Sequence, residues 1–166
     1  MHTYIQAIAV GFPEIQCFAH GDGTVYASIQ SADPGIPLPS QAELDTWIRL
    51  ETQQEVWAEI QVIRAARSAG GIRVGANWFH SDATSRIQQL ALVMFGQSMP
   101  QGIMWKTMGG TFVGMTPALA GQIFQAAAAS DMAIFAIAEQ KRAAMLLMAD
   151  PGEYDVNSGW PLSYGE

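Results

Sequence analysis

Three segments of the chain carry apolar residues every three or four positions, which is the spacing of one face of an α-helix. They are residues 41–68, 83–95 and 116–149. Ser40 opens a capping-box pattern before the first segment, and Thr116 followed by proline precedes the third. Glycines follow the first two segments and an Asp-Pro pair follows the third, as is typical of helix ends. The pattern therefore predicts three helices.

Shorter segments between these helices favour β structure around turn residues. Residues 14–30 predict two strands joined by a tight Gly-Asp-Gly turn, and residues 72–80 predict a strand or a small hairpin. Residues 104–115 predict a hairpin that turns at Gly109-Gly110. If that turn has two residues, Trp105, Thr107 and Phe112 share one face. We expect Trp105 and Phe112 to pack this face against the last helix, near Leu119 or Ile123.

Three prolines in residues 34–39 predict an extended, stiff linker, because proline fixes φ and lacks an amide donor. We expect an N-terminal hairpin module and linker at 1–39, a helix-hairpin-helix-hairpin-helix domain at 40–150, and an extended C-terminal tail at 151–166. The predicted fold is α+β, with long helices packed on short antiparallel hairpins.

Charged residues make up 14% of the chain, whereas about 25% is usual for a soluble domain. Either other chains cover part of the surface, or a small domain has an unusually large core. The nine Met, five Trp and seven Phe residues provide large, adaptable contact area of the kind enriched at interfaces. The net charge of −7 and the absence of a basic run argue against nucleic-acid binding.

The N-terminal sequence lacks the pattern of a signal peptide, and Cys17 is the only cysteine, so no internal disulfide is expected. Glu139, Lys141 and Arg142 interrupt the longest apolar segment, which falls short of the roughly 20 apolar residues that span a bilayer. We expect no membrane association and a location in a cytoplasm.

The stretch WFHSDATSR, residues 78–86, places His80, Ser81 and Asp82 side by side, and these are the residue types of a hydrolase triad. Consecutive side chains diverge, however, whereas a triad requires them to converge. We interpret Ser81 or Asp82 as the N-cap of the following helix. The three histidines are scattered and show no metal-binding spacing, so no catalytic, metal or cofactor site is predicted.

Two stretches, GGIRVGANWFHSDATSR and MWKTMGGTFVGMT, resemble a C-terminal domain of bacteriophage and prophage tail proteins, the domain of unknown function 4376 type. The resemblance covers about 71–145. It rests on an ordered pattern of Gly71, Gly75, Phe79, Ser81-Asp82, Ser85-Arg86, Trp105-Lys106-Thr107, a glycine turn and Thr116. It implies a tail component or a tail-fibre assembly chaperone, and it brings no catalytic residues with it.

The last predicted helix has an apolar face too wide for one short neighbour to cover. One row contains Leu119, Ile123, Ala127, Ile134, Ala138, Met145 and Met148, and a second contains Ala120, Phe124, Ala128, Phe135 and Leu146. We expect Lys141 and Arg142 to lie at the rim of this face. The width of the face predicts a homo-oligomer or a complex with another protein.

The residue patterns predict a non-catalytic protein that binds another protein, and the resemblance implies that the partner is a phage tail fibre or another tail protein, bound during assembly in the host bacterial cytoplasm. A permanent component of the tail tip or baseplate, retained in the virion, is the alternative, and a glycan hydrolase is a distant one. The candidate partner-binding residues are Trp105, Phe112, Phe124, Phe135, Trp160 and Tyr164.

Overall fold

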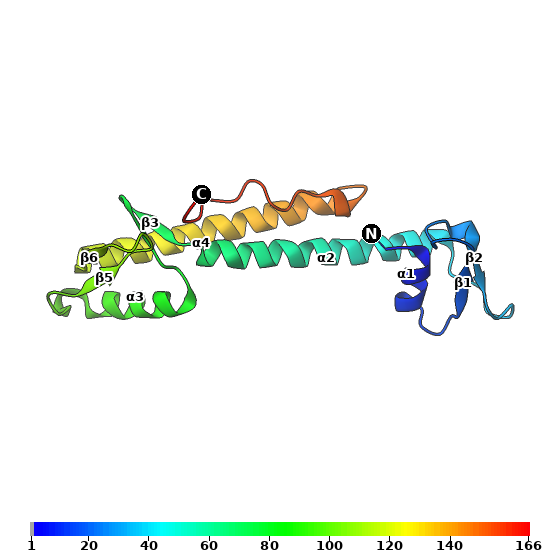
Figure 1. Cartoon of the computed structure of the whole chain (residues 1–166), viewed down its shortest axis with the longest axis horizontal. Helices are drawn as coiled ribbons and strands as arrows, with labels where there is room; N and C mark the ends of the chain where they lie inside the picture. Colours follow the sequence, from blue (N-terminus) through cyan, green and yellow to red (C-terminus); the bar gives the residue numbers. More distant parts are fainter. Residues whose placement is uncertain (1) are drawn as a thin grey trace. The chain divides into compact units, whose positions relative to one another are not determined.

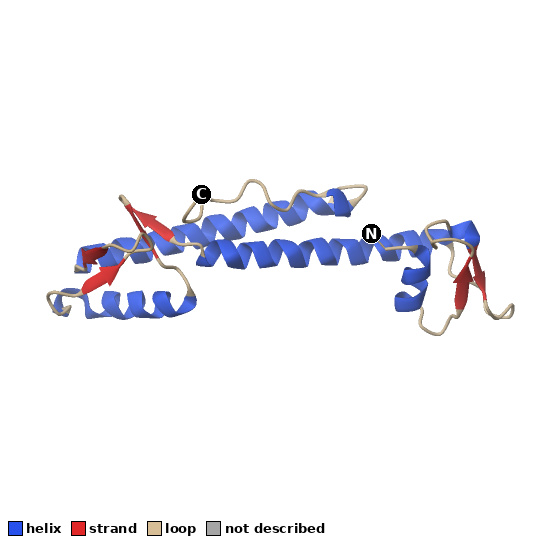
Figure 2. Ribbon diagram, in the orientation of Figure 1, coloured by secondary structure: helices blue, strands red, loops and turns tan. Residues whose placement is uncertain are grey.

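The computed structural model describes residues 2–166 and has an α+β fold, in which the α-helices accompany short two-stranded antiparallel sheets (Figures 1 and 2). The chain forms two compact units. One contains the residues up to Glu59 together with Ala143–Asp155, and the other contains Ile60–Arg142 with Val156–Glu166. The boundaries at 59/60 and 142/143 fall inside helices, α2 (Gln41–Ala69) and α4 (Pro117–Leu146), and the third, at 155/156, lies beyond α4. The domain borders expected at residues 39/40 and 150/151 remain a prediction.

The first unit begins with a helix that the sequence analysis missed, α1 (Tyr4–Gly11). Thr3 and Gln6 form a reciprocal capping box: the Thr3 hydroxyl accepts from the Gln6 amide, and the Gln6 side chain accepts from the Thr3 amide at 2.9 Å. The Thr-x-x-Gln pattern that specifies this cap is present in the sequence.

The hairpin expected in residues 14–30 exists, but its strands are shorter and its connection is longer than predicted. Strand β1 (Cys17–Ala19) pairs antiparallel with β2 (Ile29–Ser31). The expected tight turn is wrong, because residues 20–28 connect the strands and Tyr26–Ser28 is a 3-10 helix. Tyr26, which lies in this connection, contacts two other segments of the first unit. Its hydroxyl donates to the Pro39 carbonyl at 2.7 Å, and its ring packs against the Tyr4 ring in a T-shaped arrangement.

The core of the first unit consists of Ala7, Ile8, Ile29 and Leu44, and Leu38 of the Pro-rich segment packs against it. Helix α2 starts at the predicted capping box. The Ser40 amide donates to the Glu43 carboxylate at 2.8 Å, and the Glu43 amide donates to the Ser40 hydroxyl at 3.3 Å. The helix ends before Gly71, whose φ of +101° only glycine adopts readily.

The second unit contains the other two hairpins and a short helix. Strands β3 (Ile72–Val74) and β4 (Asn77–Phe79) form the small hairpin foreseen in residues 72–80. Helix α3 (Ala83–Phe95) has the predicted bounds and ends at Gly96. Strands β5 (Met104–Lys106) and β6 (Phe112–Gly114) form the last hairpin, and all three sheets are drawn as red arrows in Figure 2.

The turn of this last hairpin is one residue longer than the two-residue turn considered above. The Thr107 amide donates to the Thr111 carbonyl, and Trp105 pairs with Val113 while Lys106 pairs with Phe112. A shift of one residue in a strand moves its side chains to the opposite face. Trp105 therefore packs on the core, whereas Phe112 is 62% exposed, and the prediction that they share a buried face is wrong for Phe112.

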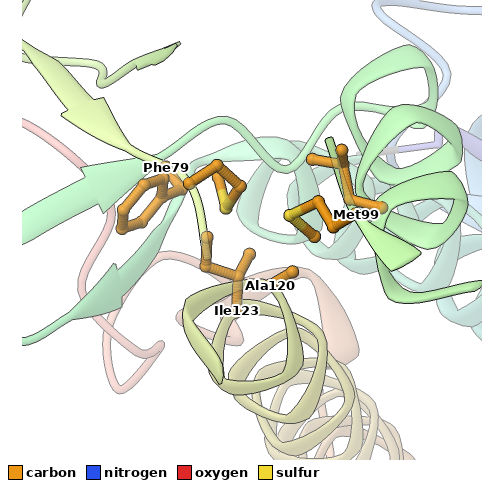
Figure 3. Packing of buried hydrophobic residues seen from close by; sticks show 6 residues of the cluster. Phe79, Met99, Ala120 and Ile123 are labelled. Carbon is orange, nitrogen blue, oxygen red and sulfur yellow. The ribbon is translucent and has the colours of Figure 1, made fainter. Parts of the chain in front are cut away.

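The core of the second unit gathers side chains from β4, α3, the loops and α4. Figure 3 shows the side chains of this buried cluster, with Phe79, Met99, Ala120 and Ile123 labelled. Trp105 and Leu119 pack around this cluster as partly buried residues. The predicted packing of Trp105 near the start of the last helix is thus confirmed.

Helix α4 begins at the predicted cap, where the Leu119 amide donates to the Thr116 hydroxyl at 3.1 Å, and ends at Leu146, before the expected Ala149. Its buried positions form a single narrow row: Ala120, Ile123, Ala127, Ile134, Ala138, Lys141 and Met145. Most of the second predicted apolar row is exposed. The expectation that Lys141 lies at a solvent rim is wrong, because this side chain is buried and its ammonium lies 5.5 Å from the Trp160 ring centre.

Candidate functional site

His80, Ser81 and Asp82 form a joint between two helices, and their side chains have different partners. The Ser81 hydroxyl is buried, donates to the Ser68 carbonyl at 2.7 Å and accepts from the Gly71 amide at 2.9 Å. Asp82 is the N-cap of α3, and its carboxylate accepts from the Ser85 amide at 3.0 Å. The residue His80 is exposed. The arrangement lacks the convergence of a triad and instead fixes the end of α2 against the start of α3.

The Asp82 carboxylate also accepts from the Ser85 hydroxyl at 2.6 Å. This side-chain hydrogen bond, followed by the one from the Ser85 amide, holds the pKa of Asp82 below its usual value. The carboxylate therefore stays charged at the positive end of the α3 dipole. The Asp82 carboxylate thus acts as the N-cap of α3.

Arg86 completes this joint by binding three segments of the second unit. Its guanidinium donates to the Ser81 carbonyl and to the Ser68 carbonyl, the latter at 3.0 Å. It also forms a bidentate ion pair with the Asp131 carboxylate. Asp131 belongs to α4, so one side chain links the end of α2, the start of α3 and the middle of α4. The motif residues Ser81, Asp82 and Arg86 thus have structural partners.

An apolar groove lies between α3 and α4 of the second unit. Ile87, Leu90, Phe124 and Ala127 line it, Arg86 and Gln89 add polar atoms, and its volume is about 220 Å³. Ile87 is 70% exposed, and Met94, two helical turns further along the same side of α3, is 80% exposed. This groove with the exposed side chains of Ile87, Leu90 and Met94, called the α3–α4 groove below, is the strongest candidate binding surface.

The six aromatic candidates divide into groups with different surroundings. Phe124 lines the α3–α4 groove, and Phe135 is exposed with the Arg64 guanidinium 5.8 Å from its ring centre. Phe112 lines a separate open hollow that also contains His80 and Lys106. Trp105 reaches this hollow but packs mainly on the core. The structure therefore brings only Phe124 to the groove.

Residues 156–166 of the C-terminal tail pack along the second unit. Trp160 covers the Lys141 ammonium, and its Nε1 donates to the Val156 carbonyl at 2.8 Å. The Tyr164 amide donates to the Gly70 carbonyl at 2.8 Å. Arg67 pairs with Glu166, and this hydrogen-bonded pair lowers the pKa of the Glu166 carboxyl. The Trp160 side chain thus packs and hydrogen-bonds within the chain.

A second hollow, of about 560 Å³, lies in the first unit. Its walls carry Asp45, Glu55, Glu59, Asp150 and Glu153, and the Arg49 guanidinium donates to the Leu146 carbonyl at its edge. Within residues 2–166 no group of three or more His, Cys, Asp and Glu side chains is placed to hold a metal ion. The hollow is acidic but has no organised ligand set.

Helix α4 is the one helix in the described part of the chain that is long and apolar enough to cross a membrane by length and composition. Only 22% of its apolar window is buried. The absence of membrane association remains a prediction, and the same observation shows how much apolar surface this helix leaves uncovered.

Comparison with protein families gives one match, to the family described as a domain of unknown function, DUF4376, over residues 51–158. This match spans most of the chain. The chain belongs to the DUF4376 family. The DUF4376 region is longer than the resemblance at 71–145 and extends it into α2 and past α4. Searches of curated proteins and of solved structures found no match.

The DUF4376 region contains the Ser81–Arg86 joint, the last hairpin and the α3–α4 groove. Sequence reasoning identified the joint and Phe124, but it missed Ile87 and Met94 as surface residues. Their helical spacing was visible in the sequence, yet spacing alone does not show which face of an amphipathic helix a partner covers.

Proposed function

We propose that this DUF4376 protein is a phage or prophage tail-fibre assembly chaperone, or a fibre-associated protein, that binds another tail protein without catalysis. The observation that carries the proposal is the α3–α4 groove. The phage context is supported by the sequence resemblance described above, and the structure supports the protein-binding part.

The α3–α4 groove has the chemistry of a site for an amphipathic segment. Ile87, Leu90 and Met94 are spaced along one side of α3, and Phe124 provides an aromatic wall. A helix of a partner that inserts apolar side chains at similar spacing would remove this surface from water. Apolar burial stabilises such a complex by about 25 cal/mol per Å² before the costs of association.

The ion pair between Arg86 and Asp131 lies at one edge of this surface, since Arg86 lines the groove. The pair satisfies both charges within the chain, so a partner does not have to neutralise them. The groove therefore favours an apolar segment of a tail protein over a charged ligand.

Binding to a tail-fibre protein from the same phage or prophage is the test, measured by calorimetry with both proteins purified. Ile87→Glu and Met94→Glu should each weaken binding at least 30-fold, because each would bury a charge within the apolar contact. Leu162→Glu is the matched control, since Leu162 is 70% exposed, like Ile87, but lies in the tail. Equal affinities for all three variants, or no binding by the unmodified chain, would contradict the proposal.

Mass spectrometry of purified virions separates the two versions of this function. A fibre-assembly chaperone should be absent from the virion, whereas a permanent component of the tail tip or baseplate should be present at a fixed ratio to the fibre protein. Either result is compatible with binding at the groove, so the calorimetric experiment must come first.

A further inference from the structure

Helix α4 has a second uncovered face, which does not belong to the α3–α4 groove. Ala128, Ala129, Met132, Ala133 and Ala136 are all exposed, and Met132 is 74% exposed. None of these five residues lines the groove and none is charged. We call this the outward face of α4.

The polar residues at the two ends of the outward face are placed symmetrically about Met132, whereas Ala129 and Ala133 are matched by Phe135 and Asp131. Polar residues Gln122 and Gln125 precede it on the helix, and Glu139 and Arg142 follow it. Gln125 and Glu139 are equally far from Met132 along the chain, and so are Gln122 and Arg142. The apolar centre of the outward face is thus flanked by polar residues at equal distances on either side.

We propose that a second copy of this chain covers the outward face, with the two α4 helices antiparallel and Met132 opposite the same residue of the other copy. A two-fold interface uses the same patch on both molecules, so the patch must be complementary to itself. The symmetry about Met132 meets this requirement for an antiparallel pair. The proposal concerns a different surface from the groove and does not depend on the function proposed above.

Antiparallel pairing brings complementary side chains together. Ala128 would lie opposite Ala136, which lets the backbones approach, and Ala129 would lie opposite the large ring of Phe135. Glu139 and Arg142 form an ion pair at 3.8 Å within the helix. In the dimer, the Gln125 amide can in addition donate to the Glu139 carboxylate, and the Gln122 carbonyl can accept from the Arg142 guanidinium.

A parallel pair would instead place identical residues opposite each other. Phe135 would meet Phe135, Glu139 would meet Glu139 and Arg142 would meet Arg142. Like charges at matched positions oppose association. The side-chain order therefore favours the antiparallel arrangement.

The polar residues along the helix favour a second copy over a lipid bilayer as the occupant. The net charge of −7 makes two copies repel each other, and contact through an uncharged face keeps that repulsion lowest. A bilayer would have to accept Gln122, Gln125 and Glu139 beside the same face, and polar groups in hydrocarbon are costly.

The size of the face predicts a reversible dimer. Residues 122–142 extend about 30 Å at the usual helical rise, and a contact strip about as wide as the helix gives roughly 400 Å² per copy. A standard interface uses about 800 Å² per partner. We therefore expect a weak dimer that dissociates on dilution.

Sedimentation equilibrium of the full chain from about 1 to 300 μM tests association. The unmodified chain should dimerise, and Met132→Glu should raise the dissociation constant at least tenfold. Met94→Glu is the matched control, because it places the same charge at another highly exposed methionine, on α3. Circular dichroism checks that each variant is folded. A chain that remains monomeric throughout, or unchanged dimerisation of Met132→Glu, would overturn the proposal.

Cysteine cross-linking tests the arrangement, with Cys17→Ser removing the natural thiol. Under mild oxidation Met132→Cys should cross-link to itself, and a mixture of Ala128→Cys with Ala136→Cys should form a mixed dimer. Efficient self-linking of Ala128→Cys would indicate parallel helices and overturn the register. Flotation of monomeric chain with phosphatidylcholine–phosphatidylglycerol vesicles would assign the face to lipid and also overturn the proposal.

The two surfaces are tested independently by the same variants. Met94→Glu should lose fibre binding and retain the dimer, whereas Met132→Glu should lose the dimer and retain fibre binding. Failure of one proposal is therefore distinguishable from failure of the other.

Discussion

Ser81 connects two backbone segments through one small hydroxyl group. It accepts from the Gly71 amide and donates to the Ser68 carbonyl in a buried position. Gly71 itself is confined, since the Met108 sulfur occupies the space that a Cβ would need and its φ is positive. The local geometry thus depends on Ser81 and Gly71, and both belong to the sequence pattern on which the DUF4376 resemblance rests.

Ser81→Ala should lower the free energy of unfolding by about 1–3 kcal/mol, because the buried Gly71 amide would lose its acceptor. His80→Ala, at the exposed neighbouring position, should change it by less than about 0.5 kcal/mol. Urea unfolding of both variants provides the measurement. A larger effect at His80 than at Ser81 would show that the joint has been misinterpreted.

Asp82 gives stability a defined dependence on pH. Its folded-state pKa is lowered, so the stabilisation is present above the unfolded-state pKa of about 4 and is lost as the pH falls through the folded-state value. Asp82→Asn should therefore reduce the loss of stability between about pH 5 and pH 2. Unfolding curves across this range, with Glu14→Gln as a control at an exposed loop carboxylate, would test it. An unchanged pH profile would argue against the cap.

At the scale of elements, hairpin register decides which aromatic side chain is buried. Trp105 and Phe112 belong to adjacent strands, but only Trp105 packs on the core of the second unit. The difference follows from the length of the turn, because the Thr107–Thr111 pairing leaves Met108, Gly109 and Gly110 in the loop.

Trp105→Ala should destabilise the fold by about 3 kcal/mol, at the lower end of the range for a large core aromatic because its side chain is partly buried. Phe112→Ala should cost less than about 1 kcal/mol, since the ring is mainly in solvent. Thermal or urea unfolding distinguishes the two. Equal losses would mean that Phe112 is also part of the core.

The elements most accessible to sequence reasoning were those with local signals. The Ser40–Glu43 box, the Gly96 stop and the Thr116 cap each set a helix end through neighbouring residues. Helix α1 had such a signal at Thr3 and Gln6, and it was overlooked. The face of Phe112 and the burial of Lys141 depend on turn length and on a contact with Trp160, which spacing does not encode.

At the scale of the whole molecule, the tail contributes to the second unit. Trp160→Ala should lower the free energy of unfolding by about 2 kcal/mol, because Lys141 would lose the ring that covers it and the Val156 carbonyl would lose its donor. Trp160→Phe should recover part of the loss by keeping a ring. If Trp160→Ala leaves stability unchanged but weakens fibre binding, the tail would be an interface rather than part of the fold.

The two units interleave along the chain, and this affects how the protein is made. The first needs residues Ala143–Asp155 in addition to its N-terminal part, and the second needs Val156–Glu166. Synthesis runs from the N-terminus, so the first unit is incomplete until residues 143–155 have been made, and the second until residues 156–166 have been made. Until then, the nascent chain has unpaired apolar helix faces. Ribosomes that stop early would therefore release fragments in which both units are incomplete, and quality-control proteases should remove them.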